Sequence, residues 1–226
     1  MIVPQRFEIA VGSAGSVSAL LIRPDPARAC FVFAHGAGAG MTHSSMEAVA
    51  QGLAERGVAS LRYQFPYMEK GSKRPDTPPI AHAAVRSAVA EAGRRCAGLR
   101  LIAGGKSFGG RMTSQAQAAA PLAGVDGLAF FGFPLHPAGK PSDDRAGHLS
   151  DVKIPMLFLQ GTKDKLAELA LLEPVVRRLG RKASLHLVEG ADHSFHVPAR
   201  SGRNDREVLG EILDAFVGWI GAIERQ

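Results

Sequence analysis

The chain has 226 residues, of which 46% are hydrophobic and 21% charged, and its formal net charge is +6. A chain of this length buries about 70% of its unfolded surface on folding, so it needs neither disulfides nor a structural metal. Its basic residues stand in small scattered groups with no aromatic residues between them, unlike the pattern typical of a nucleic-acid-binding surface.

Two segments with strand character come first, residues 6–11 and 17–22, and the turn between them predicts a hairpin. From Cys30 onward, short apolar runs alternate with amphipathic segments, which indicates a mostly parallel sheet with helices on both faces. We therefore expect an α/β fold in a single domain covering residues 1–226. The further expected strands are residues 30–34, 58–63, 99–103, 127–131, 156–159 and 184–188, and the expected helices are 46–56, 81–95, 112–120, 166–179 and 208–223.

Local signals mark several ends in this pattern. Asn204, followed three positions later by Glu207, imitates a capping box at the start of the last helix. Gly180 ends the helix before it, and Pro121 ends the helix that follows Gly110.

The N-terminal segment and the two cysteines indicate in which cellular compartment the protein resides. Residues 1–11 contain Pro4, Arg6 and Glu8 where a signal peptide needs an apolar stretch, and no apolar run approaches the roughly 20 residues of a membrane span. Cys30 and Cys96 match no metal or redox motif, so we expect reduced, buried thiols. These features predict a cytoplasmic protein with no membrane association.

A motif typical of a catalytic nucleophile follows the expected strand at residues 99–103. Gly105-Lys106-Ser107-Phe108-Gly109 matches Gly-x-Ser-x-Gly between a strand and a helix. A serine held on a sharp, strained turn needs small residues two positions before and after it. Ser107 is therefore the candidate nucleophile.

A serine nucleophile requires a base and a carboxylate that orients the base. Asp164 follows the expected strand at 156–159, and His193 follows the one at 184–188. Because ligands of open α/β sheets bind at the carboxyl ends of strands, we expect all three side chains to meet there. The chain order Ser107, Asp164, His193 predicts a catalytic triad.

Alternatives remain for two of these positions. Asp126 or Asp192 could replace Asp164 as the acid, and His196 could replace His193 as the base. A metal site is not expected, because the histidines and aspartates here show no recognised ligand spacing.

The glycine-rich turn His35-Gly36-Ala37-Gly38-Ala39-Gly40 can bring backbone N–H groups close to a developing negative charge. We expect Ala37 and Phe108 to supply the two oxyanion donors. Candidate substrate contacts are His35, Gly38, Lys106 and His136, although hydrogen bonds that hold the turn are the favoured role for His35. Lys106 could attract a substrate carboxylate, but an exposed lysine is usually only solvated.

The connection at residues 132–153 is too short for a helical cap domain. We therefore expect an open cleft, which favours esters with short chains.

These motifs resemble those of the α/β-hydrolases, over nearly the whole chain. The similarity is greatest to a small lidless branch around dienelactone hydrolase, whose uncharacterised relatives share sequences like Gly104–Arg111 and Gly190–Phe195. Dienelactone hydrolase itself has a cysteine nucleophile where this chain has Ser107, which favours ester hydrolysis and places the dienelactone substrate in doubt.

The resemblance implies a cofactor-independent serine hydrolase that cleaves small acyl substrates through an acyl-enzyme. Acyl transfer is one alternative. A catalytically silent interaction module is another, because a related domain occurs in a subunit of a histone-acetyltransferase complex. The oligomeric state stays open.

Overall fold

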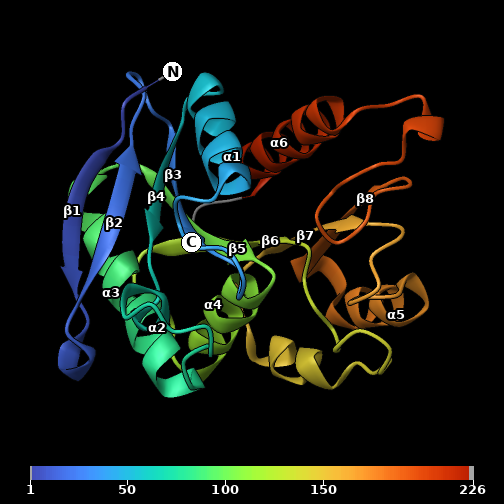
Figure 1. Ribbon diagram of the computed structural model, residues 1–226, viewed down its shortest axis with the longest axis horizontal. Helices are drawn as coiled ribbons and strands as arrows, with labels where there is room; N and C mark the ends of the chain where they lie inside the picture. The colour runs from blue at the N-terminus through green and yellow to red at the C-terminus, as the bar shows by residue number, and fades with distance from the viewer. Residues whose placement is uncertain (1, 224–226) are drawn as a thin grey trace.

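One sheet of eight strands forms the centre of the computed structural model, which describes residues 2–223 (Figure 1). Its strand order is β1-β2-β4-β3-β5-β6-β7-β8. The pairs β1–β2 and β2–β4 are antiparallel and the other neighbours are parallel, so the hairpin and the mostly parallel sheet are confirmed. The strands are β1 Gln5–Ala10, β2 Ser16–Ile22, β3 Ala29–Ala34, β4 Val58–Tyr63, β5 Arg100–Lys106, β6 Val125–Phe131, β7 Met156–Gly161 and β8 Ala183–Val188.

Helices cover both faces of this sheet (Figure 1). Within residues 2–223, no helix is both long enough and apolar enough to cross a bilayer. On one face lie α1 (Ser44–Glu55) and α6 (Asp205–Ala222), on the other α3 (Pro78–Arg95), α4 (Phe108–Ala119) and α5 (Leu169–Leu179), with α2 (Pro66–Glu69) in the connection after β4.

Strand β3 shows why the central strands are apolar throughout. Phe31 and Phe33 belong to the core beneath α1 and α6, whereas Cys30 and Val32 belong to the core beneath α3, α4 and α5. Successive side chains of a strand point to opposite faces, so a strand covered on both sides is apolar at every position. Cys30 and Cys96 are free and buried, as predicted.

The expected bounds differ most around Ser107. Strand β5 continues to Lys106 and α4 begins at Phe108, so a single residue joins strand to helix. The glycines on either side of Ser107 have low propensity for both strand and helix, so the sequence pattern predicts that both elements stop short of it. Tertiary packing extends the strand and the helix through these glycines. At the other end of the chain, both hydrogen bonds of the Asn204–Glu207 capping box are present.

The connection from β6 to β7 carries no cap domain. Its regular structure is one 3-10 segment, Asp144–Asp151, which packs beside α4. Within the described part of the chain the carboxyl edge of the sheet is therefore uncovered by any inserted domain, as expected.

Substitution of Gly105 in β5 tests how closely the backbone packs there, and Gly218 in α6 provides the control. A Cβ at Gly105 would lie 2.4 Å from the carbonyl oxygen of Ala34, whereas a Cβ at Gly218 in α6 would meet nothing within 4 Å. Gly105→Ala should lower the free energy of unfolding by about 3 kcal/mol, because a backbone atom cannot turn away. Gly218→Ala should raise it by about 0.5–1 kcal/mol through helix propensity. Urea denaturation measures both, and equal effects would contradict this account.

Candidate active site

Ser107 is the single residue between β5 and α4, and its backbone is strained. Its φ of 50° and ψ of −113° lie in a region that residues with a side chain rarely adopt. A Cβ at Gly105 or at Gly109 would lie 2.4 or 2.5 Å from the Ala34 carbonyl oxygen. Small residues on both sides of Ser107 are therefore a steric requirement of this turn, which holds the hydroxyl at the carboxyl end of the sheet.

Asp164 and His193 are hydrogen-bonded to each other across the turns that follow β7 and β8. Oδ2 of Asp164 lies 2.6 Å from Nδ1 of His193, and only 3% of Asp164 is exposed. The carboxylate also accepts hydrogen bonds from the Gln160 side-chain amide and from the Leu166 backbone N–H. A carboxylate on Nδ1 directs the proton to that nitrogen and leaves Nε2 free to accept one.

Gln160 is a positioning residue that sequence reasoning missed. Its buried side chain accepts a hydrogen bond from the Phe133 backbone N–H at 2.9 Å and donates one to Asp164. A buried side-chain amide needs such partners on both sides. The sequence does carry a signal for this role: Gln160 is the polar residue in the otherwise apolar strand β7, and it stands four positions before Asp164.

The turns that carry the acid and the histidine contact each other directly. The Lys163 N–H donates to the Ala191 carbonyl at 2.9 Å, and the Gly190 N–H donates to the Thr162 hydroxyl at 2.8 Å. A Cβ at Gly161 would lie 2.3 Å from the same Ala191 carbonyl oxygen. Backbone contacts therefore set the separation of the two side chains.

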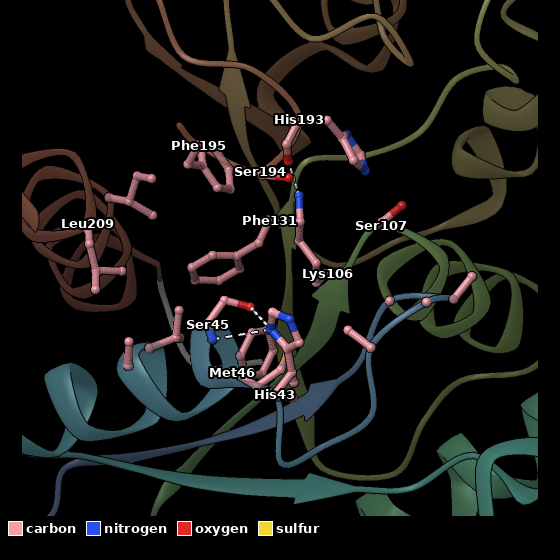
Figure 2. A pocket seen from close by; sticks show the side chains of 18 of the residues that line it. His43, Ser45, Met46, Lys106, Ser107, Phe131, His193, Ser194, Phe195 and Leu209 are labelled. Carbon is pink, nitrogen blue, oxygen red and sulfur yellow. Dashed lines mark hydrogen bonds between the residues drawn. The ribbon is translucent and has the colours of Figure 1, made fainter. Parts of the chain in front are cut away.

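Ser107 and His193 line one cavity, and Figure 2 shows the His193 ring on the same side of that cavity as Ser107. Among the described side chains, no hydrogen bond joins the Ser107 hydroxyl to the ring. In active sites without substrate this bond is often long and tightens when substrate binds. The structure thus brings the three predicted residues to one site.

Residues from the segment after β4 hold the turn that follows β3. The Tyr67 hydroxyl donates to the Ala37 carbonyl at 2.8 Å, and the Gln64 side chain accepts from the Met41 N–H at 2.9 Å. Within residues 2–223, neither the Ala37 nor the Phe108 N–H donates to a backbone carbonyl. A turn held in this way keeps its N–H groups in place before charge develops.

His35 is part of this support. Its side chain is fully buried, with Nε2 accepting from the Phe65 N–H at 3.0 Å and Nδ1 lying 2.7 Å from the Gly36 carbonyl. Because Nε2 accepts, the proton is on Nδ1 and is donated to Gly36. Burial lowers the pKa of His35 to about 4, so the ring is neutral near pH 7. These contacts agree with the role that the sequence favours for His35, which is to hold the turn by hydrogen bonds. His35 does not line the cavity.

The other three candidate substrate contacts differ in position. His136 is fully buried beside the Pro137 carbonyl and does not line the cavity, so its position does not fit the predicted contact with substrate. Gly38 and Lys106 do line it. Nζ of Lys106 donates to the His193 carbonyl and lies 4.9 Å from the centre of the Phe195 ring. Burial lowers the pKa of Lys106 to about 8.

The alternative acids and base have other partners. Asp126 accepts from the Leu101 N–H at the amino end of the sheet. Asp192 accepts from backbone N–H groups of the turn that follows it, and His196 pairs with the exposed Asp205 at 2.9 Å. No group of three His, Cys, Asp or Glu side chains among residues 2–223 is arranged to hold a metal ion.

A second serine–histidine pair lies away from the cavity. Oγ of Ser114 is 2.7 Å from Nε2 of His148 and also donates to the Arg111 carbonyl. Ser114 is fully buried in the middle of α4, where no substrate can reach it. This pair connects α4 to the 3-10 segment that carries His148.

Comparison with known proteins gives consistent matches. The family model described as an alpha/beta hydrolase domain matches residues 27–221. A dienelactone hydrolase from Anabaena variabilis has a TM-score of 0.78 at 21% identity, covering 98% of this chain and 99% of the other. A lidless serine hydrolase from Xanthomonas campestris has a TM-score of 0.74 at 18% identity and covers 96% and 95%. The esterase domain of a Rhodothermus marinus protein has a TM-score of 0.73 at 14% identity and covers 97% and 98%.

The buried neutral His35 predicts a loss of stability in acid. Its pKa is about 4 in the folded protein, against an ordinary value of 6.5, so the unfolded chain binds more protons between these values. The contribution of His35 is complete above pH 6.5 and falls by about 3 kcal/mol as the pH drops through 4.

Urea unfolding of the wild type and of His35→Gln between pH 7.5 and 4 measures this loss. The stability advantage of the wild type should shrink as the pH falls, because glutamine does not titrate. Two curves that stay parallel over the whole range would contradict the assignment.

Proposed function

Because this chain belongs to the alpha/beta hydrolase domain family, we propose that it is a single-domain serine hydrolase that cleaves small carboxylic esters through an acyl-enzyme. The observation that carries the proposal is the 2.6 Å hydrogen bond from buried Asp164 to His193, which lines the same cavity as Ser107. A buried carboxylate on a half-buried histidine, facing a serine on a strained turn, is the arrangement that nucleophilic acyl transfer needs.

The first half of the reaction forms the acyl-enzyme. Oγ of Ser107 attacks the ester carbonyl while Nε2 of His193 accepts the hydroxyl proton. Asp164 keeps the other proton on Nδ1 and stabilises the imidazolium that forms. As the tetrahedral intermediate collapses, His193 gives its proton to the departing alkoxide, which leaves as the alcohol.

The second half repeats these steps with water. His193 takes a proton from water, the hydroxide attacks the acyl carbonyl, and the proton returns to Ser107 as the carboxylic acid leaves. In both halves the negative charge on the carbonyl oxygen is stabilised by the N–H groups of Ala37 and Phe108. A donor of this kind is typically worth about 2.7–4 kcal/mol of barrier.

Two further observations support an ester substrate. The proposed nucleophile is the hydroxyl of Ser107 and not a thiol, and the structurally similar Rhodothermus marinus protein carries an esterase domain. The surroundings of Ser107 also favour turnover over a purely scaffolding role, because a scaffold does not require a strained serine or a buried carboxylate bonded to a histidine.

Two serines provide a matched pair for testing this proposal. Ser107→Ala should lower kcat on p-nitrophenyl acetate by about 10⁶, and Asp164→Asn should lower it by about 10⁴, with the fold intact. Ser114→Ala removes the other serine that contacts a histidine, and it should leave kcat within a fewfold of wild type. A fluorophosphonate probe should label wild type and Ser114→Ala, but not Ser107→Ala.

Folding of each variant is checked by circular dichroism and thermal unfolding. A folded wild-type protein that resists the probe and hydrolyses no ester would refute the proposal. Equal loss of activity in the two serine variants would also count against it.

A further inference from the structure

Apolar side chains form most of the cavity wall beside Ser107. The cavity has a volume of about 580 Å³, within the roughly 300–1,000 Å³ typical of small-molecule sites. The rings of Phe33 and Phe131, 5.3 Å apart, rise from the sheet. The apolar wall consists of Phe33 from β3, Phe131 from β6, Phe195 from the turn after β8, Met46 and Val49 from α1, and Leu209 and Ile212 from α6.

This apolar wall lies beside the reacting group. In Figure 2, Phe131, Phe195, Met46 and Leu209 gather on one side of Lys106, and Ser107 lies on the other. A substrate whose carbonyl reaches Ser107 can therefore place an attached group against the wall.

The charged groups that line the cavity already have protein partners. Lys106 donates to the His193 carbonyl, and His193 is bonded to Asp164. Asp205 pairs with His196 and also accepts from the Val197 N–H. A second charge placed here would have to compete with these partners, whereas an apolar group displaces only water.

The Phe195 ring is held in place by its backbone. Its φ of 64° is positive, which is uncommon for a residue with a side chain. The Phe195 N–H donates to the Asp192 carbonyl at 3.0 Å, and the Asp192 carboxylate accepts from the next N–H, that of His196. Strain maintained by several hydrogen bonds is typical of ligand sites, and here it directs an aromatic ring toward the cavity.

From this geometry we propose that the cavity binds an apolar group of the ester, so that esters with a medium-length chain are preferred over acetates. The proposal rests on the proposed function, since it assigns the cavity to the ester that Ser107 attacks. It revises the expectation of short-chain preference, which considered only the missing cap. Helices α1 and α6 supply part of this apolar wall, which forms without an inserted domain in residues 2–223.

Two ester series test the proposal on the wild-type protein. The kcat/KM for p-nitrophenyl acetate, butyrate and hexanoate should rise roughly fourfold for each added methylene group. The series ethyl, butyl and hexyl acetate places the chain on the alcohol instead. A rise in the first series assigns the cavity to the acyl group, and a rise in the second assigns it to the alcohol. No rise in either series overturns the proposal.

Variants on α6 provide a matched comparison. Leu209→Trp narrows the cavity and should lower the long-chain-to-short-chain ratio of kcat/KM at least tenfold, measured in whichever of the two series rises in the wild type. Leu209→Ala widens it and should move the preference toward a longer chain in the same series. Val217→Ala changes another half-buried aliphatic residue of α6 that does not line the cavity, and its ratio should equal that of wild type. Equal long-chain-to-short-chain ratios in Leu209→Trp and Val217→Ala, in the series that rises in the wild type, would overturn the proposal.

Fluorophosphonate labelling separates the two hypotheses. Wild-type protein that is labelled at Ser107 but shows no chain-length dependence overturns this inference alone. Protein that is not labelled and hydrolyses no ester in either series overturns the proposed function and this inference together.

Discussion

The carbonyl oxygen of Ala34 imposes the constraint on which the site depends. It lies within 2.4–2.5 Å of where a Cβ would stand at Gly105 and at Gly109, so the chain passes it closely before and after Ser107. Ala34 is also the last residue of β3, directly before the turn that contains Ala37. This close approach of the two backbones therefore sets the position of Ser107 relative to the turn that carries Ala37, one of the two proposed oxyanion donors, and a methyl group at either glycine would disturb it.

The rest of the site is organised in the same way, by direct bonds among the turns at the carboxyl edge of the sheet. Gln160 holds Asp164, Lys163 joins the acid turn to the histidine turn, and Lys106 holds the His193 carbonyl. Reacting groups held by rigid elements lose little entropy when the transition state forms.

The cavity follows from how α1 and α6 pack on each other. A Cβ at Gly52 of α1 would lie 2.4 Å from Leu213 of α6, so the two helices approach closely at that level. Nearer the start of each helix, the side chains line the cavity instead of filling the gap between the helices. These residues are Val49 on α1 and Leu209 on α6. The absence of a cap therefore does not imply the absence of an apolar binding site.

The sequence by itself determined the α/β class, the hairpin, the last helix cap and the three residues that the structure brings to one site. It did so because strand period, capping boxes and Gly-x-Ser-x-Gly are local patterns, and because parallel strands present their carboxyl ends at one edge. The tertiary structure alone decided which carboxylate bonds to which histidine, that Gln160 supports Asp164, and that His35 and His136 are buried. It also decided that α1 and α6 enclose an apolar cavity. These features depend on contacts between residues far apart in the chain, whose distances no local pattern encodes.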